Sequence, residues 1–330
     1  MRRFSPVPLL LAAVLTLAAA CGDGGGNSQQ AAKRPATEGG SVSTRLPVVA
    51  TTTHLTDFVR IVGGDHVDVY GILKPNVDAH DFEPSPADIA ELAQAKIIVK
   101  NGVGLEEWFD STIRNAGTKA TIVEAAQGVT IRRGEGGHDD EAEEGHEGEE
   151  AHADGDPHIW QDPRNAKVMV RHITAALVAA DPAHRADYEA NEAAYRAELD
   201  RLDAEIAAEI AGLTNKKIVT NHDAFGYYID RYGLEFVGSI IPSFDSQAEL
   251  SARDISNIVK RIKATGVKAV FSESSLPPKT AEAIGREAGV AVVAGDDALY
   301  GDSLGPPGSA GDTYLRMLRH NTRQIVDHLR

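Results

Sequence analysis

Four short segments of this 330-residue chain carry imidazole and carboxylate side chains in patterns suited to metal coordination. Their donors are nitrogen and oxygen atoms, which suit borderline and hard divalent cations such as zinc and manganese. The segments are residues 77–86 (VDAHDFEPSP), 156–163 (DPHIWQDP), 220–226 (TNHDAFG) and 300–305 (YGDSLG).

The chain has one cysteine, Cys21, so a metal site in the folded body must be built without thiolates. Three imidazoles and one carboxylate complete the four positions of a zinc ion. A catalytic zinc site usually keeps one position open for water, so a complete set favours carrying a metal over catalysis. We therefore expect no enzyme, and no HExxH motif occurs in the chain.

Residues 134–156 form an acidic, histidine-rich stretch that contains His138, His146 and His152 among eleven carboxylates and no basic residue. Such a composition cannot bury a core, so we expect a disordered loop. We predict that the loop captures metal as an accessory; the alternative is a solubilising insertion. It supplies −11 of the net charge of −16. The sequence has no basic stripe, and its charge balance is wrong for neutralising phosphates, so we expect no nucleic-acid partner.

The N-terminus has the pattern of an export signal. Arg2 and Arg3 precede an apolar run, residues 8–20, that is too short to span a bilayer comfortably. Cys21 follows small residues, which resembles a bacterial lipoprotein signal. We expect a signal peptide at 1–20, lipidation of Cys21 and a flexible tether at 21–45. The alternative is ordinary cleavage and release of the chain.

Apolar runs and helical patterns alternate through both halves of the remaining chain, which predicts two α/β domains built from βαβ units around parallel sheets. Between them, residues 183–211 have helical periodicity on one face and end at Gly212. We expect an N-terminal domain at 46–180, a linker helix at 181–212 and a C-terminal domain at 213–330.

The expected elements place the four segments together. Three of them follow predicted strands, and ligands bind at the carboxyl ends of strands in open α/β sheets. The remaining one leads into a helix that Asp162 caps, with Pro163 at its first position. We expect all four to meet in one cleft between the domains.

The motifs resemble those of the substrate-binding lipoproteins of zinc and manganese ABC importers, in the zinc, ZnuA-like branch. The resemblance covers residues 46–330 and rests on four motifs in the same order and spacing. It includes a stretch similar to that family's rigid helix joining two α/β domains. The motifs are VDAHDFEPSPAD, DPHIWQDPRNA, VTNHDAFGYYIDRYGL and DSLGPPGSAGDTYLRMLRHNT, and the helix is DYEANEAAYRAELDRLDAEIAAEI.

By residue-to-residue transfer, the resemblance implies four metal ligands: His80, His158, His222 and Asp302. The manganese branch has Glu where this chain has His222, so the histidine favours zinc. One departure is Ala79, where the family often has Pro.

A metal-bound imidazole usually donates its other N–H to a carboxylate or carbonyl. Glu273, which follows a predicted strand, is the expected partner of one ligand. Asp78, Asp81 and Asp223 are weaker candidates.

The resemblance also implies function: a monomeric extracytoplasmic protein, anchored to the membrane by lipid, that delivers Zn²⁺ to an ABC permease and its ATPase. The alternatives are a manganese-preferring carrier, a zinc-dependent hydrolase, and a surface adhesin or metal buffer.

Overall fold

The computed structural model describes residues 45–133 and 155–330. The predicted signal peptide, Cys21, and the loop residues His138, His146 and His152 lie outside these ranges. No helix in the described part of the chain is both long and apolar enough to cross a bilayer.

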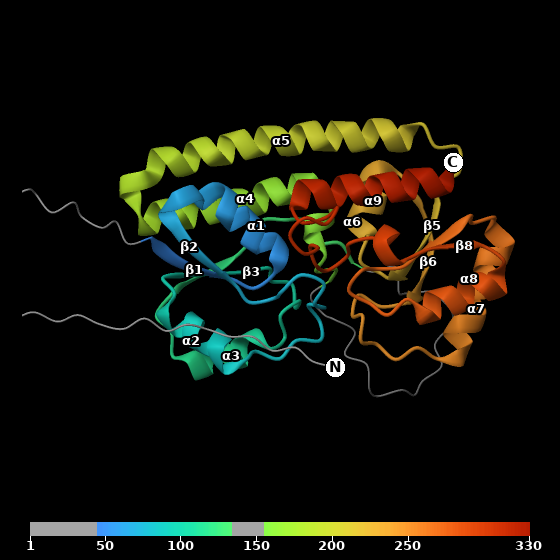
Figure 1. Cartoon of the computed structure of the whole chain (residues 1–330), viewed down its shortest axis with the longest axis horizontal. Helices are drawn as coiled ribbons and strands as arrows, with labels where there is room; N and C mark the ends of the chain where they lie inside the picture. The colour runs from blue at the N-terminus through green and yellow to red at the C-terminus, as the bar shows by residue number, and fades with distance from the viewer. Residues whose placement is uncertain (1–44, 134–154) are drawn as a thin grey trace, which may run out of the picture. The chain divides into compact units, whose positions relative to one another are not determined.

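The first half contains a four-stranded parallel sheet in the order β2-β1-β3-β4 (Figure 1). Its inner strands are apolar and buried on both faces, as expected where helices cover a parallel sheet. In the register, Val48 pairs with Val69 on one side and Ile97 on the other. The strands are β1 (Leu46–Ala50), β2 (Val67–Gly71), β3 (Ile97–Lys100) and β4 (Thr121–Glu124).

Local capping signals begin several helices of this half. The Ser85 side chain accepts from Asp88 N–H, and the Asp88 side chain accepts in return, which forms a capping box. The Asp162 carboxylate likewise accepts from Arg164 N–H, with Pro163 at the first helical position. The helices are α1 (Thr53–Gly63), α2 (Pro86–Gln94), α3 (Phe109–Ala116) and α4 (Pro163–Ala180).

The second half repeats the same topology, with a parallel sheet in the order β6-β5-β7-β8. In both sheets the first strand of the half is central and the second is at an edge, so the prediction of two similar α/β units is confirmed. The strands are β5 (Lys217–His222), β6 (Glu235–Ile241), β7 (Ala269–Phe271) and β8 (Ala291–Val293), and the helices are α6 (Gly226–Tyr232), α7 (Ala252–Thr265), α8 (Lys279–Ala288) and α9 (Tyr314–Leu329).

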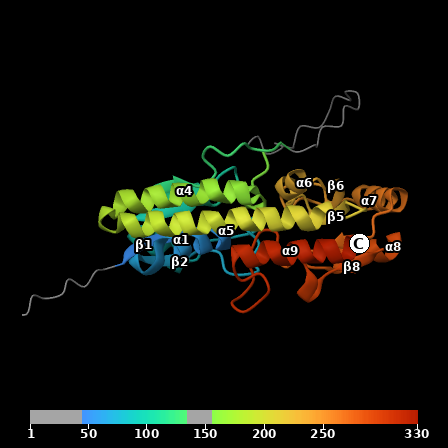
Figure 2. The same cartoon turned by 90° about the horizontal axis from the view of Figure 1, so that it is seen from above.

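One long helix, α5 (Arg185–Ala211), runs beside both halves (Figures 1 and 2). Its 27 residues span about 40 Å. It packs on α1 and α4 of the first half and on α6 and α9 of the second. The helix begins later than residue 183, because Pro182–His184 forms a 3₁₀ turn. Its buried face consists of Tyr188, Tyr195, Leu199, Leu202, Ile206 and Ile210.

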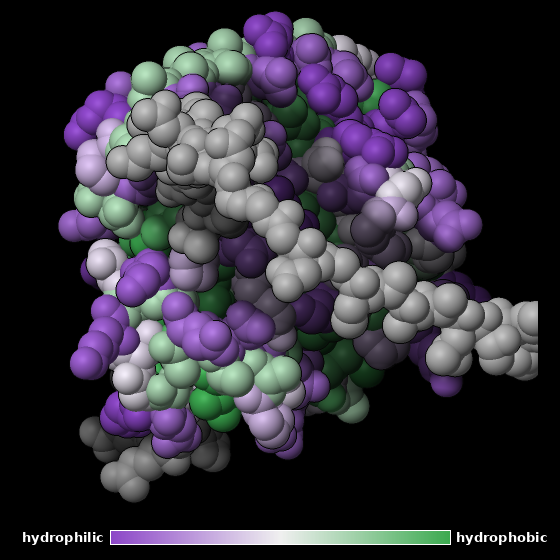
Figure 3. All heavy atoms as spheres, turned by 60° about the vertical axis from the view of Figure 1, so that its left-hand side comes forward, coloured by the Kyte–Doolittle hydropathy of each residue, from purple (hydrophilic) through white to green (hydrophobic). Residues whose placement is uncertain are grey.

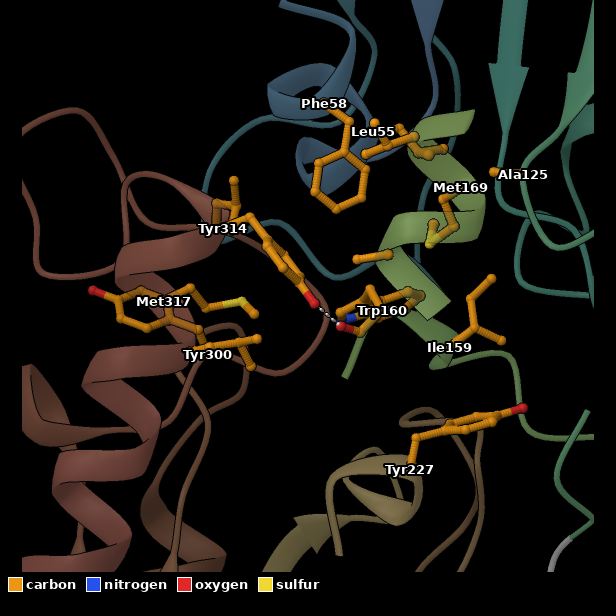
Figure 4. Packing of buried hydrophobic residues seen from close by; sticks show 14 of the residues in the cluster. Leu55, Phe58, Ala125, Ile159, Trp160, Met169, Tyr227, Tyr300, Tyr314 and Met317 are labelled. Carbon is orange, nitrogen blue, oxygen red and sulfur yellow. Dashed lines mark hydrogen bonds between the residues drawn. The ribbon is translucent and has the colours of Figure 1, made fainter. Parts of the chain in front are cut away.

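A shared core connects the halves where α9 meets α1. The ring of Tyr314 packs edge-on against Phe58 at 4.9 Å between centroids, and its hydroxyl donates to the carbonyl of Trp160 at 2.6 Å (Figure 4). Both rings and the indole are completely buried. On the face in Figure 3, apolar residues form small areas among polar ones. Among the described residues, Ile122 is the one large apolar residue that is exposed.

Candidate metal centre

The four residues that the motifs single out lie together in the fold. One donor atom from each of His80, His158, His222 and Asp302 lies within 4.8 Å of the others. The Nε2 atom of His158 is 3.4 Å from that of His80 and 3.3 Å from that of His222. Ligands at 2.0–2.1 Å from a tetrahedral zinc ion are themselves about 3.3–3.4 Å apart. The spacing of these nitrogen atoms fits that geometry.

Asp302 closes the cluster. Its carboxylate oxygens lie 3.3 Å from Nε2 of His158, 3.2 Å from that of His222 and 3.7 Å from that of His80. Both oxygens are buried, and neither accepts a conventional hydrogen bond within the described ranges. A buried carboxylate that accepts no hydrogen bonds needs compensating positive charge. A cation at the centre of the cluster, or protons on the imidazoles, would supply it.

Strand ends position most of these side chains. His222 is the last residue of β5, which continues two residues beyond the end expected from the sequence at Thr220. His80 lies in the connection between β2 and α2, and Asp302 in the connection between β8 and α9. His158 directly precedes the 3₁₀ turn Ile159–Gln161, which leads into α4.

Two of the three imidazoles are oriented by carboxylates. Glu273 Oε1 accepts from Nδ1 of His222 at 2.8 Å and from its backbone N–H at 3.1 Å. Asp156 Oδ1 makes the equivalent contacts with His158, at 2.8 Å and 3.0 Å. These bonds hold the rings with Nε2 toward the cluster and set the tautomer that binds a cation. Glu273 was the partner expected from the sequence.

Asp156 was expected to end the disordered loop at 134–156, but it is fully buried and holds His158, so the end of that loop was placed too late. It was not predicted as a partner, although its place two residues before His158 allows the same carboxylate to reach both ring and backbone. The weaker candidates take other roles. Asp78 accepts from the backbone N–H of His80 at 3.0 Å rather than from its ring. Asp81 is exposed, and the backbone N–H of Asp223 donates to the Ser243 carbonyl.

Charges around the cluster change the protonation of two imidazoles. Burial lowers the pKa of His158, but the hydrogen bond to Asp156 and the negative charges of Asp156 and Asp302 outweigh it and raise that pKa to about 9. At His222 burial is likewise outweighed, by Glu273 and Asp302, and the pKa is raised well above its usual value. In the metal-free protein these charges favour protons on the two imidazoles, and an arriving cation must compete with those protons.

The other two residues of the cluster, His80 and Asp302, are in the protonation states that metal binding requires. Burial dominates at His80 and lowers its pKa to about 4, so its imidazole is neutral at pH 7. Burial alone would raise the pKa of Asp302, but the neighbouring His222 and His158 hold it well below the usual range. Neutral imidazole and ionised carboxylate are the binding forms.

Hydrogen bonds behind the cluster fix the segments that carry it. The indole N–H of Trp160 and the side-chain amide of Gln161 both donate to the carbonyl of Gly301, at 3.0 Å and 3.1 Å. They hold the backbone directly before Asp302. Trp160 is thus a packing and anchoring residue.

A second support was missed. The Asn101 side-chain amide donates to the carbonyl of Pro157 at 2.9 Å, directly before His158. The buried Glu106 carboxylate accepts from the N–H groups of Asn101 and Gly102 and holds this turn in place. Asn101 directly follows β3, and a polar residue at the carboxyl end of a strand was the signal that could have identified it.

The two parallel sheets, the long helix beside both of them and the buried three-histidine, one-aspartate cluster define a metal-binding substrate-binding protein of ABC transporters. The chain belongs to the ZnuA family, described as zinc-uptake complex component A, periplasmic, whose model matches residues 48–328. Members of this family are transport components and not enzymes.

Relatives carry the names of different metals. The iron ABC transporter substrate-binding lipoprotein MtsA of Streptococcus pyogenes serotype M1 is 29% identical over 87% of this chain and 90% of its own length. The manganese ABC transporter substrate-binding lipoprotein PsaA of Streptococcus anginosus is 28% identical over 90% and 92%. The solved structure of the periplasmic zinc-binding protein TroA from Treponema pallidum has a TM-score of 0.76 and 26% identity, covering 87% of this chain and 99% of that one.

Proposed function

We propose that this protein is an extracytoplasmic, high-affinity zinc-binding protein that delivers Zn²⁺ to an ABC importer, and that His80, His158, His222 and Asp302 are its metal ligands. The observation that carries the proposal is the cluster of four donor atoms within 4.8 Å of one another, in which Nε2 of His158 lies 3.4 Å from that of His80 and 3.3 Å from that of His222. Such a set, complete without a water ligand, suits binding and release rather than hydrolysis.

The donor set supports zinc as the cargo. Three imidazoles and one carboxylate suit zinc, whereas manganese favours sites richer in carboxylate oxygen. A manganese-preferring carrier is the alternative within the family. Metal analysis of the purified protein after competition between equal concentrations of zinc and manganese tests this choice, and retention of manganese would favour the alternative.

Calorimetric titration with zinc tests the ligand set. We expect the wild type to bind one zinc ion tightly and His158→Ala to lose the tight site. The matched control is His172→Ala on α4, whose imidazole bonds the Gln127 carbonyl away from the cluster. Undiminished tight binding in a folded His158→Ala protein would overturn the assignment.

The other classes make different predictions. A zinc-dependent hydrolase needs an exchangeable metal-bound water and would show esterase turnover. A surface adhesin or metal buffer would lack a cognate permease. Substrate-binding components of ABC transporters work with a permease and an ATPase, so genes for both beside this one would support transport.

The remaining parts of the proposal concern the rest of the chain. We propose a lipid anchor at Cys21, a monomeric protein, and a domain division at 46–180, 181–212 and 213–330. We further propose that His138, His146 and His152 capture metal for the buried site. Deleting residues 134–154 should lower the rate of zinc capture or the total zinc bound while one tight site survives. Loss of the tight site would overturn this division of roles.

A further inference from the structure

His80 is held differently from the other members of the cluster. Its side chain keeps 9% of its surface exposed, whereas those of His158, His222 and Asp302 have none. Among the described residues, no carboxylate accepts from its Nδ1, in contrast to the other two histidines. The position of its ring therefore depends on the backbone segment that carries it.

One carboxylate connects that segment to the other half of the protein. Asp78 Oδ1 accepts from the backbone N–H of His80 at 3.0 Å. Its Oδ2 accepts from the Ser246 hydroxyl at 2.6 Å and from the Gln247 side-chain amide at 3.1 Å. Ser246 and Gln247 lie between β6 and α7. A single buried side chain thus bridges the His80 segment and the second half.

These contacts are specific rather than a general attraction between charges. Within the ranges 45–133 and 155–330, Asp78 forms no salt bridge, so neutral donors alone satisfy its buried carboxylate. Hydrogen bonds to an ionised acceptor are stronger than neutral ones and depend on geometry. The bridge is therefore stable only while the Ser246–Gln247 turn stays against the His80 segment.

We propose that Asp78 is a positioning residue that holds His80 on the bound metal, and that its contact with Ser246 and Gln247 is a latch that must open before the metal leaves. The inference rests on the proposed metal-binding function. His158, His222 and Asp302 form the fixed part of the site, and His80 is the ligand that detaches. A docking permease that displaces the Ser246–Gln247 turn would release it.

The test is the rate at which the full chain, loaded with zinc, gives up zinc to an excess of a chromogenic chelator in stopped flow. We expect Asp78→Asn to dissociate zinc at least tenfold faster and Ser246→Ala several-fold faster, with little change in association rate. A substitution that affected only folding would not raise the dissociation rate while leaving the association rate nearly unchanged. Asp81→Asn, an exposed carboxylate on the same segment, is the matched control.

Ser246→Ala tests the latch even if Asp78→Asn does not fold, because Ser246 is remote from every proposed ligand in the sequence. The double variant should be no faster than Asp78→Asn alone, since both changes break one contact. Wild-type dissociation rates in the folded single variants would overturn the latch while leaving the zinc site intact. A wild-type protein that binds no zinc would instead overturn the proposed function, and the latch with it.

Discussion

Replacing Glu273 by Gln should weaken zinc binding without removing any ligand. Glu273 is 2% exposed, and its Oε1 atom accepts two hydrogen bonds from His222. Glutamine has the same shape and retains a carbonyl oxygen at that position, so the ring stays oriented. The change removes the negative charge that makes the imidazole a stronger donor to a cation.

The expected magnitude follows from this role. Loss of such a partner typically costs 10- to 100-fold in metal affinity, which corresponds to about 1.4–2.7 kcal/mol of binding free energy. The new amide nitrogen would replace Oε2, which is buried without a partner in the described ranges. That cost affects the metal-free and metal-bound protein alike, so it changes stability more than the dissociation constant.

The pH dependence gives the prediction a second, independent part. Glu273 helps to raise the pKa of His222, so in the wild type a proton competes with zinc. Without the negative charge of Glu273 the pKa of His222 falls, and protons compete less strongly with zinc. The variant's loss of zinc affinity relative to wild type should therefore be largest near pH 8. It should become smaller toward pH 6, where protons inhibit zinc binding by the wild type more strongly than binding by the variant.

Competition titration with a zinc chelator at pH 6, 7 and 8 measures both parts. Glu287→Gln, an exposed glutamate on α8, is the control for the change of charge. A dissociation constant within about threefold of wild type at pH 8 would refute the role of Glu273. If the ratio of the variant's dissociation constant to that of the wild type increased as the pH falls, the protonation argument would be refuted.

Four further predictions concern protons, steric space and hydrogen bonding. Zinc binding at pH 7 should release protons from the His158–His222 pair, which calorimetry in buffers of different ionisation enthalpy detects. The raised pKa of His158 also makes its contribution to metal-free stability complete below pH 6.5 and lost as the pH rises through about 9; urea unfolding without zinc should show this decline. Gly301→Ala should weaken zinc binding and destabilise the fold, because the new Cβ would lie 2.0 Å from Glu273 Oε2; unaltered affinity and melting temperature would contradict this steric argument. Tyr314→Phe should cost about 1–3 kcal/mol in urea unfolding, since it leaves the Trp160 carbonyl unpaired, and should leave the zinc stoichiometry at one.

Local sequence patterns were enough to predict much of the fold and the segments of the candidate metal site. The alternation of apolar runs and helical patterns indicated parallel α/β units, because hydrophobic periodicity reflects which face of each element is buried. The long helix followed from its regular apolar face and from Gly212 at its end. The His80, His158, His222 and Asp302 segments could be selected because metal-suited side chains recur beside strand ends and helix caps.

Only the tertiary structure decided how these segments support one another. Glu273 lies 51 residues from His222 in sequence, and Asp78 lies 168 residues from Ser246. Such pairs leave no periodic signal, because they depend on how two separately formed sheets meet. Of several nearby carboxylates, the fold selects the ones that orient a ring, and within the described part of the chain it leaves His80 without such a partner. That asymmetry, which no local pattern could indicate, is the basis for the latch at Asp78.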